Sequence, residues 1–325
     1  MAKNAVNARR QAKIYAIGNL TLDIVASHVR EMPGWGTEVS VESLLFRTAG
    51  NLGNFCQALA AMGIKPLMIG NVGKDREGEQ ILEELGNAGL DTRPIRIEEN
   101  ARTSVSITVV KDDGERVFFT FPGQLELIDK PFLDRFIDHV EKGSLVIICS
   151  LFQLPNLRLA EVAEIASELK RKGCTVLVDP GWDPNDWKPD TVDGIRRLLP
   201  VLDYFLPNIE EAGRIAGSQS EARILSSLTD SGAVNVIIKK GASGCVALMN
   251  GHILSSSAYA ATAVDSTGAG DVFNAALIYC LRNDIETQRM LDFANAAASL
   301  SIARSTNRYP RVAEIEAALQ RGIET

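Results

Sequence analysis

Residues 264–277 read Val264-Asp265-Ser266-Thr267-Gly268-Ala269-Gly270-Asp271-Val272-Phe273-Asn274-Ala275-Ala276-Leu277, a small-residue turn that leads into an apolar segment. It contains a turn of three small residues, Gly268, Ala269 and Gly270, which Asp271 follows directly. From Val272 onward, apolar side chains recur at the spacing of one helix face. We therefore expect Asp271 in the first turn of a buried helix, with the glycines forming its entry.

The start of such a helix suits an anion. The first backbone N–H groups have no partner inside the helix, and the helix dipole adds partial positive charge there. A carboxylate beside an anion site suits a reaction in which N–H groups hold a phosphoryl group while a base accepts the proton of an attacking hydroxyl. The alternative is a tight strand-to-helix turn in which the carboxylate only complements the dipole.

The composition is that of a globular α/β protein. The chain has 325 residues, 46% hydrophobic and 23% charged, enough for one large domain or two smaller ones. Its net charge is −7 and no basic stripe occurs, so nucleic acid is not expected as a partner. No apolar run approaches the roughly 20 residues of a membrane helix, so no membrane partner is expected either.

The cysteines and histidines form neither a disulfide framework nor a zinc pattern. The five cysteines include no CxxC pair, and the three histidines are scattered. This usage favours a reducing compartment, and we expect a cytoplasmic protein. Residues 1–12 are polar and lack the apolar core of a secretory signal, so they are interpreted as a loose tail.

Strands and helices alternate along most of the chain. Buried strands are predicted at residues 13–19, 67–70, 145–149, 175–178, 204–206 and 236–238. Helices are predicted at residues 160–172, 192–199, 210–216 and 221–231. This alternation indicates a mostly parallel sheet covered by helices on both faces.

Two segments of the first half predict a small separate sheet. Residues 104–110 and 117–121 flank the run Asp112-Asp113-Gly114-Glu115, which favours a hairpin turn. Within residues 35–48, Val39 and Val41 alternate with polar residues, as in a half-exposed strand. The alternative is an ordinary hairpin at the edge of the main sheet.

Several polar residues follow predicted strands or open helices. Asp23 follows the first strand, at the edge where open α/β sheets bind ligands, or it is a turn carboxylate. Asn51 and Asn54 offer amide donors and acceptors to substrate hydroxyls, or they cap the helix that they open. Lys239 either offers charge to phosphates or is a solvated surface lysine.

These motifs together resemble the ribokinase-like (PfkB) carbohydrate kinases over residues 13 to about 315. Residues 267–271 before an apolar helix resemble the C-terminal signature of that family. Residues 49–54 resemble its N-terminal signature, with Ala49 in place of the first glycine. Weaker matches are the GxDxxG turn at 73–78, the NxxE motif at 208–211 and the nucleotide-binding turn at 239–244.

The resemblance implies a ribokinase-like three-layer α/β sandwich. Its central sheet is mostly parallel, with helices on both faces and a small β lid. The kinase domain then spans residues 13–325, with lid insertions at about 33–48 and 102–123. The lid would exclude water, which is a competing phosphoryl acceptor. A homodimer through the lid is also expected.

The activity implied is ATP-dependent, Mg-assisted phosphoryl transfer to a hydroxyl of a small sugar or sugar-like substrate. Asp271 would be the base, and the N–H groups of Gly268, Ala269 and Gly270 would hold the charge on the transferred group. The residues implied in substrate binding are Asp23, Gly50, Asn51 and Asn54. Those implied at the nucleotide are Asn208, Lys239, Gly241, Gly244 and Asn295.

Asn208 and Glu211 are implied to organise Mg²⁺ through water. They lie three residues apart at a predicted helix start, so they project to one side, and Mg²⁺ takes oxygen ligands and keeps several waters. The alternative is a capping box, in which each side chain bonds the backbone of the other.

A monovalent cation is implied between Asp265–Thr267 and a second loop at residues 303–308. Asp265 and Thr267 would contribute to that site. The second loop lacks the glycine expected there, although Asn307 tolerates positive φ better than most residues. Arg304 and Arg308 flank the loop, and a guanidinium would repel a cation. We therefore expect K⁺ to be needed weakly or not at all.

The substrate is the least determined part of the prediction. Family members that act on phosphosugars often place a lysine in the N-terminal signature, and residues 49–54 contain no cation, which disfavours a substrate that already carries phosphate. The alternatives are a nucleoside kinase, with Trp35 or Trp182 stacking on a base, and a catalytically silent sugar-binding protein. The chain has neither a GxxxxGK[ST] nor a GxGxxG motif, which disfavours P-loop kinases and dinucleotide enzymes.

Overall fold

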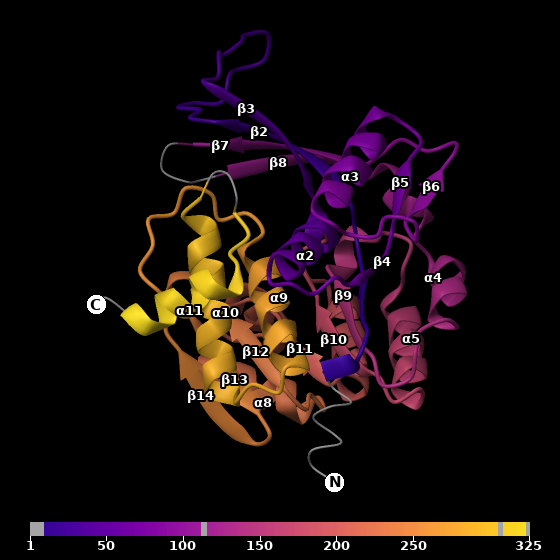
Figure 1. The fold of residues 1–325 in the computed structure, drawn as a ribbon, viewed down its shortest axis with the longest axis vertical. Coiled ribbons are helices and arrows are strands. Elements are labelled where there is room, and N and C mark those ends of the chain that lie inside the picture. The colour runs from indigo at the N-terminus through magenta and orange to yellow at the C-terminus, as the bar shows by residue number, and fades with distance from the viewer. Residues whose placement is uncertain (1–9, 112–115, 305–307, 323–325) are drawn as a thin grey trace.

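Apolar, β-branched segments of the chain form the centre of an eight-stranded sheet (Figure 1). The computed structural model describes residues 10–111, 116–304 and 308–322. The strand order is β14 (His252–Ser256), β13 (Cys245–Met249), β12 (Val236–Lys239), β11 (Tyr204–Phe205), β10 (Thr175–Asp179), β9 (Leu145–Cys149), β1 (Ile14–Ile17) and β4 (Leu67–Ile69). Neighbours from β4 to β12 are parallel, and only the β12–β13–β14 edge is antiparallel. The predicted, mostly parallel sheet is confirmed.

Helices cover both faces of this sheet, because alternate side chains of a buried strand enter two separate cores. In β1, Ile14 and Ala16 pack in one core and Tyr15 and Ile17 in the other. The first core is covered by α2 (Gly50–Ala61), α3 (Arg76–Asn87), α9 (Ala269–Arg282), α10 (Thr287–Ile302) and α11 (Val312–Arg321). The second is covered by α4 (Lys130–Ile137), α5 (Leu159–Arg171), α6 (Pro189–Leu198), α7 (Ile209–Ala216) and α8 (Glu221–Asp230). The predicted three-layer sandwich is therefore confirmed.

A second sheet, of four strands, lies at the top of Figure 1, apart from the main sheet. Its order is β3 (Ser43–Ala49), β2 (Thr21–Ser27), β7 (Val105–Val110) and β8 (Arg116–Phe121). The β2–β7 pair is parallel and the two outer pairs are antiparallel. We call these four strands the upper sheet.

The upper sheet differs from the sequence prediction in two places. Asp23 lies within strand β2 rather than in a turn. Val39 and Val41 lie outside strand β3, which begins at Ser43. The reason is that β2 ends at Ser27, opposite Ser43, so the residues before Ser43 have no β2 residue to pair with.

Smaller elements complete the described chain. Strands β5 (Asn71–Gly73) and β6 (Arg96–Glu98) form a two-stranded sheet, and the 3₁₀ turns are η1 (Gly123–Leu127), η2 (Leu151–Gln153), η3 (Leu199–Val201) and η4 (Gly241–Ser243). No helix in the described ranges has the length and apolarity needed to cross a membrane. Residues 1–9 of the expected tail, the turn at 112–115 and Asn307 lie outside the described residues.

Gln124 joins the upper sheet to the main body. Its side chain is fully buried, and its Nε2 donates to the carbonyls of Leu20 and Asn71 at 3.0 and 3.1 Å. Its Oε1 accepts a hydrogen bond from the backbone N–H of Ser104. One amide therefore pairs three buried backbone groups at the base of the upper sheet, and buried backbone groups without partners are costly.

Replacing Gln124 should destabilise the protein more than a surface substitution of the same kind. We expect Gln124→Leu to lower the free energy of unfolding by about 2–4 kcal/mol, because three buried backbone groups lose their partner. Urea denaturation followed by circular dichroism measures the change. Gln320→Leu, at an exposed position of α11, is the matched control. Equal stability of the two variants would contradict the bridging role of Gln124.

Candidate active site

Asp271 lies in the first turn of helix α9, where the sequence predicts it. The helix begins after Gly268, which has a φ of +78°. A Cβ on Gly268 would stand 2.9 Å from Nδ2 of Asn54, so the turn requires glycine for both its backbone angle and its close packing. Only 4% of Asp271 is exposed. The fold thus buries a carboxylate at a helix N-terminus, where the dipole favours negative charge.

Two amides of helix α2 hold the Asp271 carboxylate. Asn51 Nδ2 donates to Oδ1 at 2.9 Å, and Asn54 Nδ2 donates to Oδ2 at 3.0 Å. The hydroxyl of Tyr309 donates to Oδ1 of Asn54 at 2.9 Å, which fixes the orientation of that amide. The N-cap of α2 is Ala49, so the capping alternative for Asn51 and Asn54 is wrong.

Asp271 titrates in the neutral range. Burial raises its pKa to about 7, and the Asp179 carboxylate adds to the rise. The amides of Asn51 and Asn54 and the charge of Lys239 act in the opposite direction. A carboxylate with a pKa near neutral pH can accept a proton from a hydroxyl under ordinary conditions, which is what a general base requires.

Lys239 is not a surface lysine. Its side chain is 14% exposed, and its Nζ lies 2.6 Å from Oδ2 of Asp179. Burial acts to lower the pKa of Lys239, but Asp179 and Glu211 outweigh burial, so the pKa is raised and the ammonium stays charged. The amide of Asn274 on α9 donates to the same Asp179 oxygen. This buried network therefore connects to the helix that carries Asp271.

Asn208 and Glu211 form the capping box of helix α7. The Glu211 N–H donates to Asn208 Oδ1 and the Asn208 N–H donates to Glu211 Oε2, each at 2.8 Å. Burial, followed by the charge of Asp179, raises the pKa of Glu211 to about 7. Asp179, Glu211 and Asp271 thus form a buried group of three carboxylates with the single ammonium of Lys239. When all three carboxylates are ionised, the group has excess negative charge.

This donor set suits Mg²⁺ that arrives with a nucleotide. Within the described residues, no three His, Cys, Asp or Glu side chains converge to hold a metal on their own. The oxygen atoms of Asn208 and Glu211 are of the type that Mg²⁺ prefers, and Mg²⁺ keeps several waters. A cation would also relieve the excess negative charge. These residues therefore fit Mg²⁺ held through water.

A cleft of about 530 Å³ opens beside the glycine turn. It is lined by Ala269 and Gly270 of that turn and by Lys239, Gly241 and Gly244 of the nucleotide-binding turn predicted from the sequence. The rest of the lining is mostly apolar: Ala242, Ala258, Tyr259, Ala260, Ala261, Ala263, Phe273, Ala298 and Ile302, with the polar exceptions Asn295, Ser266 and Ser299. An apolar cleft that ends at an anion-binding turn suits a flat base joined to phosphates.

Gly244 and Asn295 shape this cleft around one carbonyl. A Cβ on Gly244, whose φ is +78°, would lie 2.0 Å from the carbonyl oxygen of Ser256. Nδ2 of Asn295 donates to that same oxygen at 3.1 Å. Gly50 meets a similar constraint in the first signature, because its φ is +77° and a Cβ there would stand 2.3 Å from the carbonyl of Asn19.

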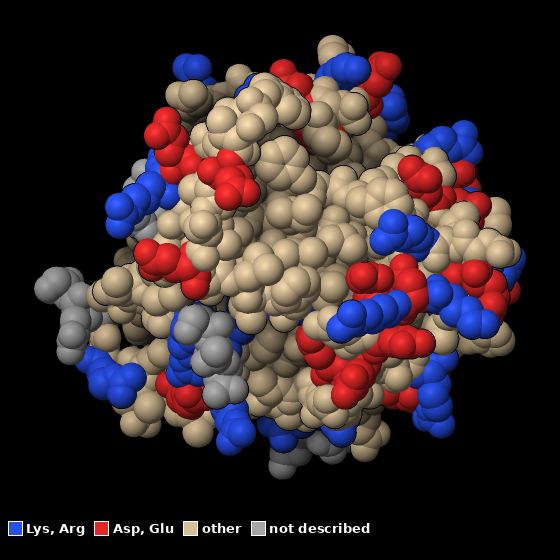
Figure 2. Space-filling view, turned by 90° about the horizontal axis from the view of Figure 1, so that it is seen from above, with Lys and Arg blue, Asp and Glu red and all other residues tan. Residues whose placement is uncertain are grey.

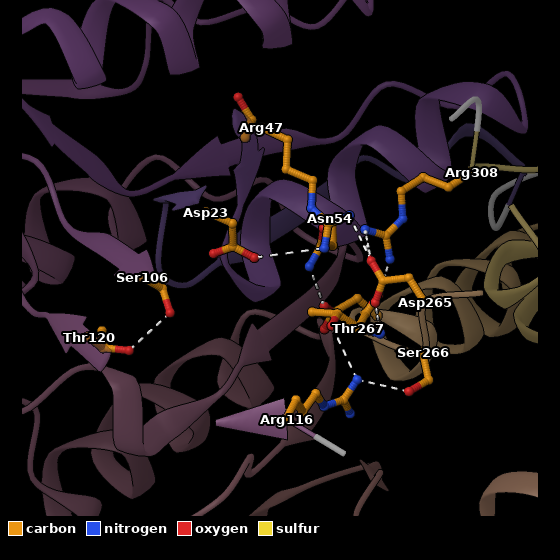
Figure 3. A network of polar contacts seen from close by, with 12 residues as sticks. Asp23, Arg47, Asn54, Ser106, Arg116, Thr120, Asp265, Ser266, Thr267 and Arg308 are labelled. Atoms are coloured by element: carbon orange, nitrogen blue, oxygen red, sulfur yellow. Dashed lines mark hydrogen bonds and ion pairs between the residues drawn. The ribbon is translucent and has the colours of Figure 1, made fainter. Parts of the chain in front are cut away.

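A polar row crosses one face of the upper sheet (Figure 3). Arg47, Asp23, Ser106 and Thr120 pair in register across β3, β2, β7 and β8, so their side chains share that face. Ser106 Oγ and Thr120 Oγ1 are 3.1 Å apart. Burial raises the pKa of Asp23 to about 6, although the charge of Arg47 opposes the rise.

Three arginines reach the segment that precedes the glycine turn. Nη1 of Arg47 and Nη1 of Arg308 lie 2.7 and 3.5 Å from the same oxygen, Oδ2 of Asp265. Arg308 Nη2 also donates to the carbonyl of Thr267. Arg116, on β8 of the upper sheet, donates to the Thr267 hydroxyl at 3.2 Å. Figure 3 shows these side chains converging from opposite sides.

These contacts do not fit a monovalent cation at Asp265 and Thr267. Such a cation needs oxygen ligands, yet the Asp265 carboxylate and the Thr267 carbonyl accept hydrogen bonds from Arg308. The Arg308 side chain is only 8% exposed, so its charge is a fixed part of the structure. Arg304, the other arginine of the predicted loop, pairs instead with Glu314 at 2.6 Å.

The structure gathers the residues predicted from sequence at two adjoining places. Lys239, Gly241, Gly244, Gly270 and Asn295 line the cleft. Asn51 and Asn54 contact Asp271, and Asp23 lies on the upper sheet. Four side chains that the sequence reasoning did not place at these positions also take part in the networks described above: Arg47, Arg116, Asn274 and Tyr309.

This geometry defines a class: three-layer α/β proteins with a buried carboxylate and a glycine turn at one helix start, beside a nucleotide-sized cleft. Residues 11–313 match the pfkB family carbohydrate kinase domain, and the chain belongs to that family. It is 27% identical over 311 residues to the ATP-dependent ribose-1-phosphate kinase of Halopiger xanaduensis, covering 94% of this chain and 97% of the relative.

Solved structures show the same fold. A putative ribokinase II from E. coli in complex with ATP and Mg²⁺ superposes with a TM-score of 0.80 at 22% identity, covering 95% of this chain and 99% of the other. A Burkholderia thailandensis nucleoside kinase in complex with inosine superposes with a TM-score of 0.78 at 20% identity, covering 95% of this chain and 98% of the other. The chain is thus an ATP-dependent kinase of the carbohydrate type.

Asp271→Asn should lower kcat by about 10²–10⁴, the usual effect of a positioned general base, because an amide cannot take up the hydroxyl proton. Affinity for ATP should change little. Release of ADP at saturating substrate measures kcat, and titration calorimetry measures ATP binding. A variant that kept more than about a tenth of kcat would rule Asp271 out as the base.

The pH profile of the wild-type enzyme should report the same group. We expect kcat/KM to rise with pH and level off above about 7, because the base must lose its proton. In Asn51→Ala the rising limb should move to higher pH. The amide of Asn51 lowers the pKa of Asp271 by stabilising its charged form, so removing that amide raises the pKa. A limb centred near pH 4, or one unmoved in the variant, would contradict this assignment.

Potassium should have little effect on the reaction. The guanidinium of Arg308 already contacts the oxygens of Asp265 and Thr267 that a cation would need. We therefore expect kcat/KM to agree within about twofold in KCl and in tetramethylammonium chloride at matched ionic strength. Activation by K⁺ of about tenfold, or 1.4 kcal/mol of barrier, would show that a cation site forms despite Arg308.

Proposed function

We propose that this kinase transfers the γ-phosphoryl group of ATP to a sugar hydroxyl, with Asp271 as the base. The observation that carries the proposal is the position of Asp271. Its carboxylate is buried, titrates near pH 7 and lies in the first turn of α9, whose glycine turn borders the cleft. The N–H groups of Gly268, Ala269 and Gly270 stabilise the negative charge that develops on the transferred group.

ATP occupies the cleft between the glycine turn and the Gly241–Gly244 turn. The apolar lining accommodates the base. Asn295 orders one wall of the cleft by donating a hydrogen bond to the carbonyl of Ser256. Asn208 and Glu211 would hold Mg²⁺ through water, and Mg²⁺ supplies charge neutralisation on the phosphates. Lys239, pinned by Asp179 within the cleft lining, adds a fixed positive charge beside Gly270.

The acceptor binds between the upper sheet and the glycine turn. Asp23, Ser106 and Thr120 offer carboxylate and hydroxyl groups to its hydroxyls from one face of the upper sheet. Asn51 and Asn54 position Asp271 and remain beside the acceptor. We favour a sugar over a nucleoside, because Trp182 already packs in an edge-to-face pair with Trp187, with ring centroids 5.8 Å apart, and Trp35 is fully exposed.

The opposite face of the upper sheet supports a homodimer. Leu44, Phe46, Ile107 and Phe119 share that face, and each is between 44% and 56% exposed. Figure 2 shows that the middle of this side of the molecule carries no charged side chains. An exposed apolar area of this kind is typical of an interface.

All five cysteines are free and buried, which supports a cytoplasmic enzyme.

A screen for ADP release tests the proposed function directly. Free sugars, sugar acids, sugar phosphates and nucleosides are offered with ATP and Mg²⁺, and ADP is measured by a coupled assay. We expect turnover with at least one sugar or sugar derivative, and we expect Asp271→Asn to abolish it. Turnover of nucleosides alone would favour the nucleoside kinase, and no turnover with any compound would overturn the proposal.

Asp23→Ala should weaken the substrate found in that screen far more than it weakens ATP. A carboxylate that accepts from two hydroxyls makes charge-assisted hydrogen bonds, so we expect KM for the sugar to rise about 30-fold or more. The KM for ATP should change less than about threefold. Thr120→Val, on the same face of the upper sheet, should have a smaller effect. Equal losses for both substrates would place Asp23 outside the sugar site.

A further inference from the structure

Positive charge gathers on the upper-sheet side of the site, outside the segment that the sequence prediction considered. That prediction used the lack of a cation in residues 49–54 to disfavour a phosphorylated substrate. Arg47 lies two residues before that run, on β3, and Arg308 lies more than 200 residues further along the chain. In the fold these two side chains meet beside Asp265 (Figure 3).

The negative groups around Arg47 and Arg308 do not fully satisfy them. Both guanidinium groups approach the same Oδ2 atom of Asp265, at 2.7 and 3.5 Å. The other nearby carboxylate, Asp23, comes only to within 4.0 Å of Nη2 of Arg47. Arg116 adds a third positive charge at the Thr267 hydroxyl. Two guanidinium groups thus share one oxygen of Asp265, and a third lies at the neighbouring Thr267 hydroxyl.

The two guanidinium groups are close enough to oppose each other. Burial lowers the pKa of Arg308, and the charge of Arg47 lowers it further. Like charges that are held together in the interior are unfavourable unless a counter-charge accompanies them. The carboxylates of Asp265 and Asp23 oppose this effect, but the pKa of Arg308 stays below its usual value.

Hydrogen-bonding capacity is also left over at the same point. Among the described residues, Nε and Nη2 of Arg47 and Nε of Arg308 are buried and have no hydrogen-bond partner. Each buried donor without a partner costs on the order of 1–3 kcal/mol. Adjacent guanidinium N–H groups match the oxygens of a phosphate or carboxylate, which accept them in pairs.

We propose that Arg47 and Arg308 form a subsite for an oxyanion, and that the sugar substrate of this kinase carries a phosphate or carboxylate group. The inference rests on the proposed function for the sugar and for the phosphoryl transfer. Asp23, Ser106 and Thr120 lie in the same row as Arg47, so one substrate presents its hydroxyls to them and its anionic group to the arginines. A neutral sugar offers these donors only hydroxyl oxygens, which form weaker hydrogen bonds with a guanidinium than charged oxygens do.

The two arginines come from different parts of the fold, so a ligand held by both would join the upper sheet to the main body. Arg47 belongs to the upper sheet, whereas Arg308 follows α10 in the main body. An anionic group that enters beneath the upper sheet therefore meets both guanidinium groups at once. The competing account is that the arginines only fasten the upper sheet to Asp265, and the experiment below separates the two.

Binding without ATP tests the subsite independently of turnover. Titration calorimetry at constant ionic strength compares ribose with ribose 1-phosphate, ribose 5-phosphate and ribonate, fructose with its 1- and 6-phosphates, and glucose with gluconate. We expect at least one acidic member to bind 30-fold or more tighter than its neutral parent. The phosphate and carboxylate members identify which anion is recognised. If no acidic member binds more tightly than its parent, the proposal is overturned.

Variants show whether the arginines cause the preference. Arg47→Met should reduce the affinity ratio of acidic to neutral sugar at least tenfold. Arg47→Lys keeps the positive charge but loses the paired N–H donors of the guanidinium group, so it should reduce the ratio less. Arg171→Met, an exposed change on α5, removes the same charge and should keep the wild-type ratio. Arg308→Met gives a second test if Arg47→Met does not fold. If the folded arginine variants keep the wild-type affinity ratio of acidic to neutral sugar, the arginines only attach the upper sheet to Asp265 and the subsite is overturned.

Release of ADP from the same compounds keeps the two proposals apart. Turnover of neutral sugars without any preference for their acidic forms would leave the kinase activity standing and overturn the subsite. Tight, Arg47-dependent binding of an acidic sugar without ADP release would support the subsite and overturn the proposed transfer. Preferred turnover of an acidic sugar, lost in Arg47→Met, is the result that we expect.

Discussion

The structure of the site depends on keeping the Asp271 carboxylate away from water. Its burial would be prohibitive without compensation, and three features supply it: the amides of Asn51 and Asn54 and the N-terminal end of α9. Helices α2 and α9 must therefore pack side by side with these residues opposite one another. The glycine at position 268 makes this approach feasible, because a side chain there would collide with Asn54. Burial then raises the pKa of Asp271 to about 7, so the requirement for packing also produces a group suited to accept a proton.

Charge of opposite sign is arranged on the two sides of this carboxylate. On the side of the cleft, Asp179 and Glu211 leave excess negative charge around Lys239, which suits a nucleotide that brings its own divalent cation. On the side of the upper sheet, Arg47 and Arg308 keep buried N–H donors without a partner, which suits an acidic acceptor. Each substrate would thus be attracted to its own side of the site, and two anionic substrates would be held apart except at the glycine turn.

The sequence predicts the fold well where the signals are local. The alternation of strands with helices was sufficient to predict a mostly parallel sheet covered on both faces, because strand and helix periods differ and can be read over short windows. The family resemblance of the stretch around Asp271 and the other motifs implied the three-layer sandwich. The hairpin of β13 and β14 was missed even though Asn250-Gly251 marks its turn with positive φ at both residues. The upper sheet was predicted only in part, because strand β2 has no pattern of its own and is completed by partners far along the chain. The sequence placed Arg308 near Asp265–Thr267, but the positions of Arg47 and Tyr309 follow only from the tertiary fold, so the prediction from residues 49–54 alone overlooked the arginines.

The pKa of Asp271 in the folded protein tests the account most directly. Carboxyl ¹³C resonances of aspartate-labelled protein can be followed by NMR between pH 3 and pH 9, with Asp271→Asn to assign the signal. The account predicts one aspartate resonance that titrates near pH 7 and disappears in the variant. A resonance of Asp271 that titrates near pH 4, like an exposed carboxyl, would contradict the claim that burial prepares this residue to act as the base.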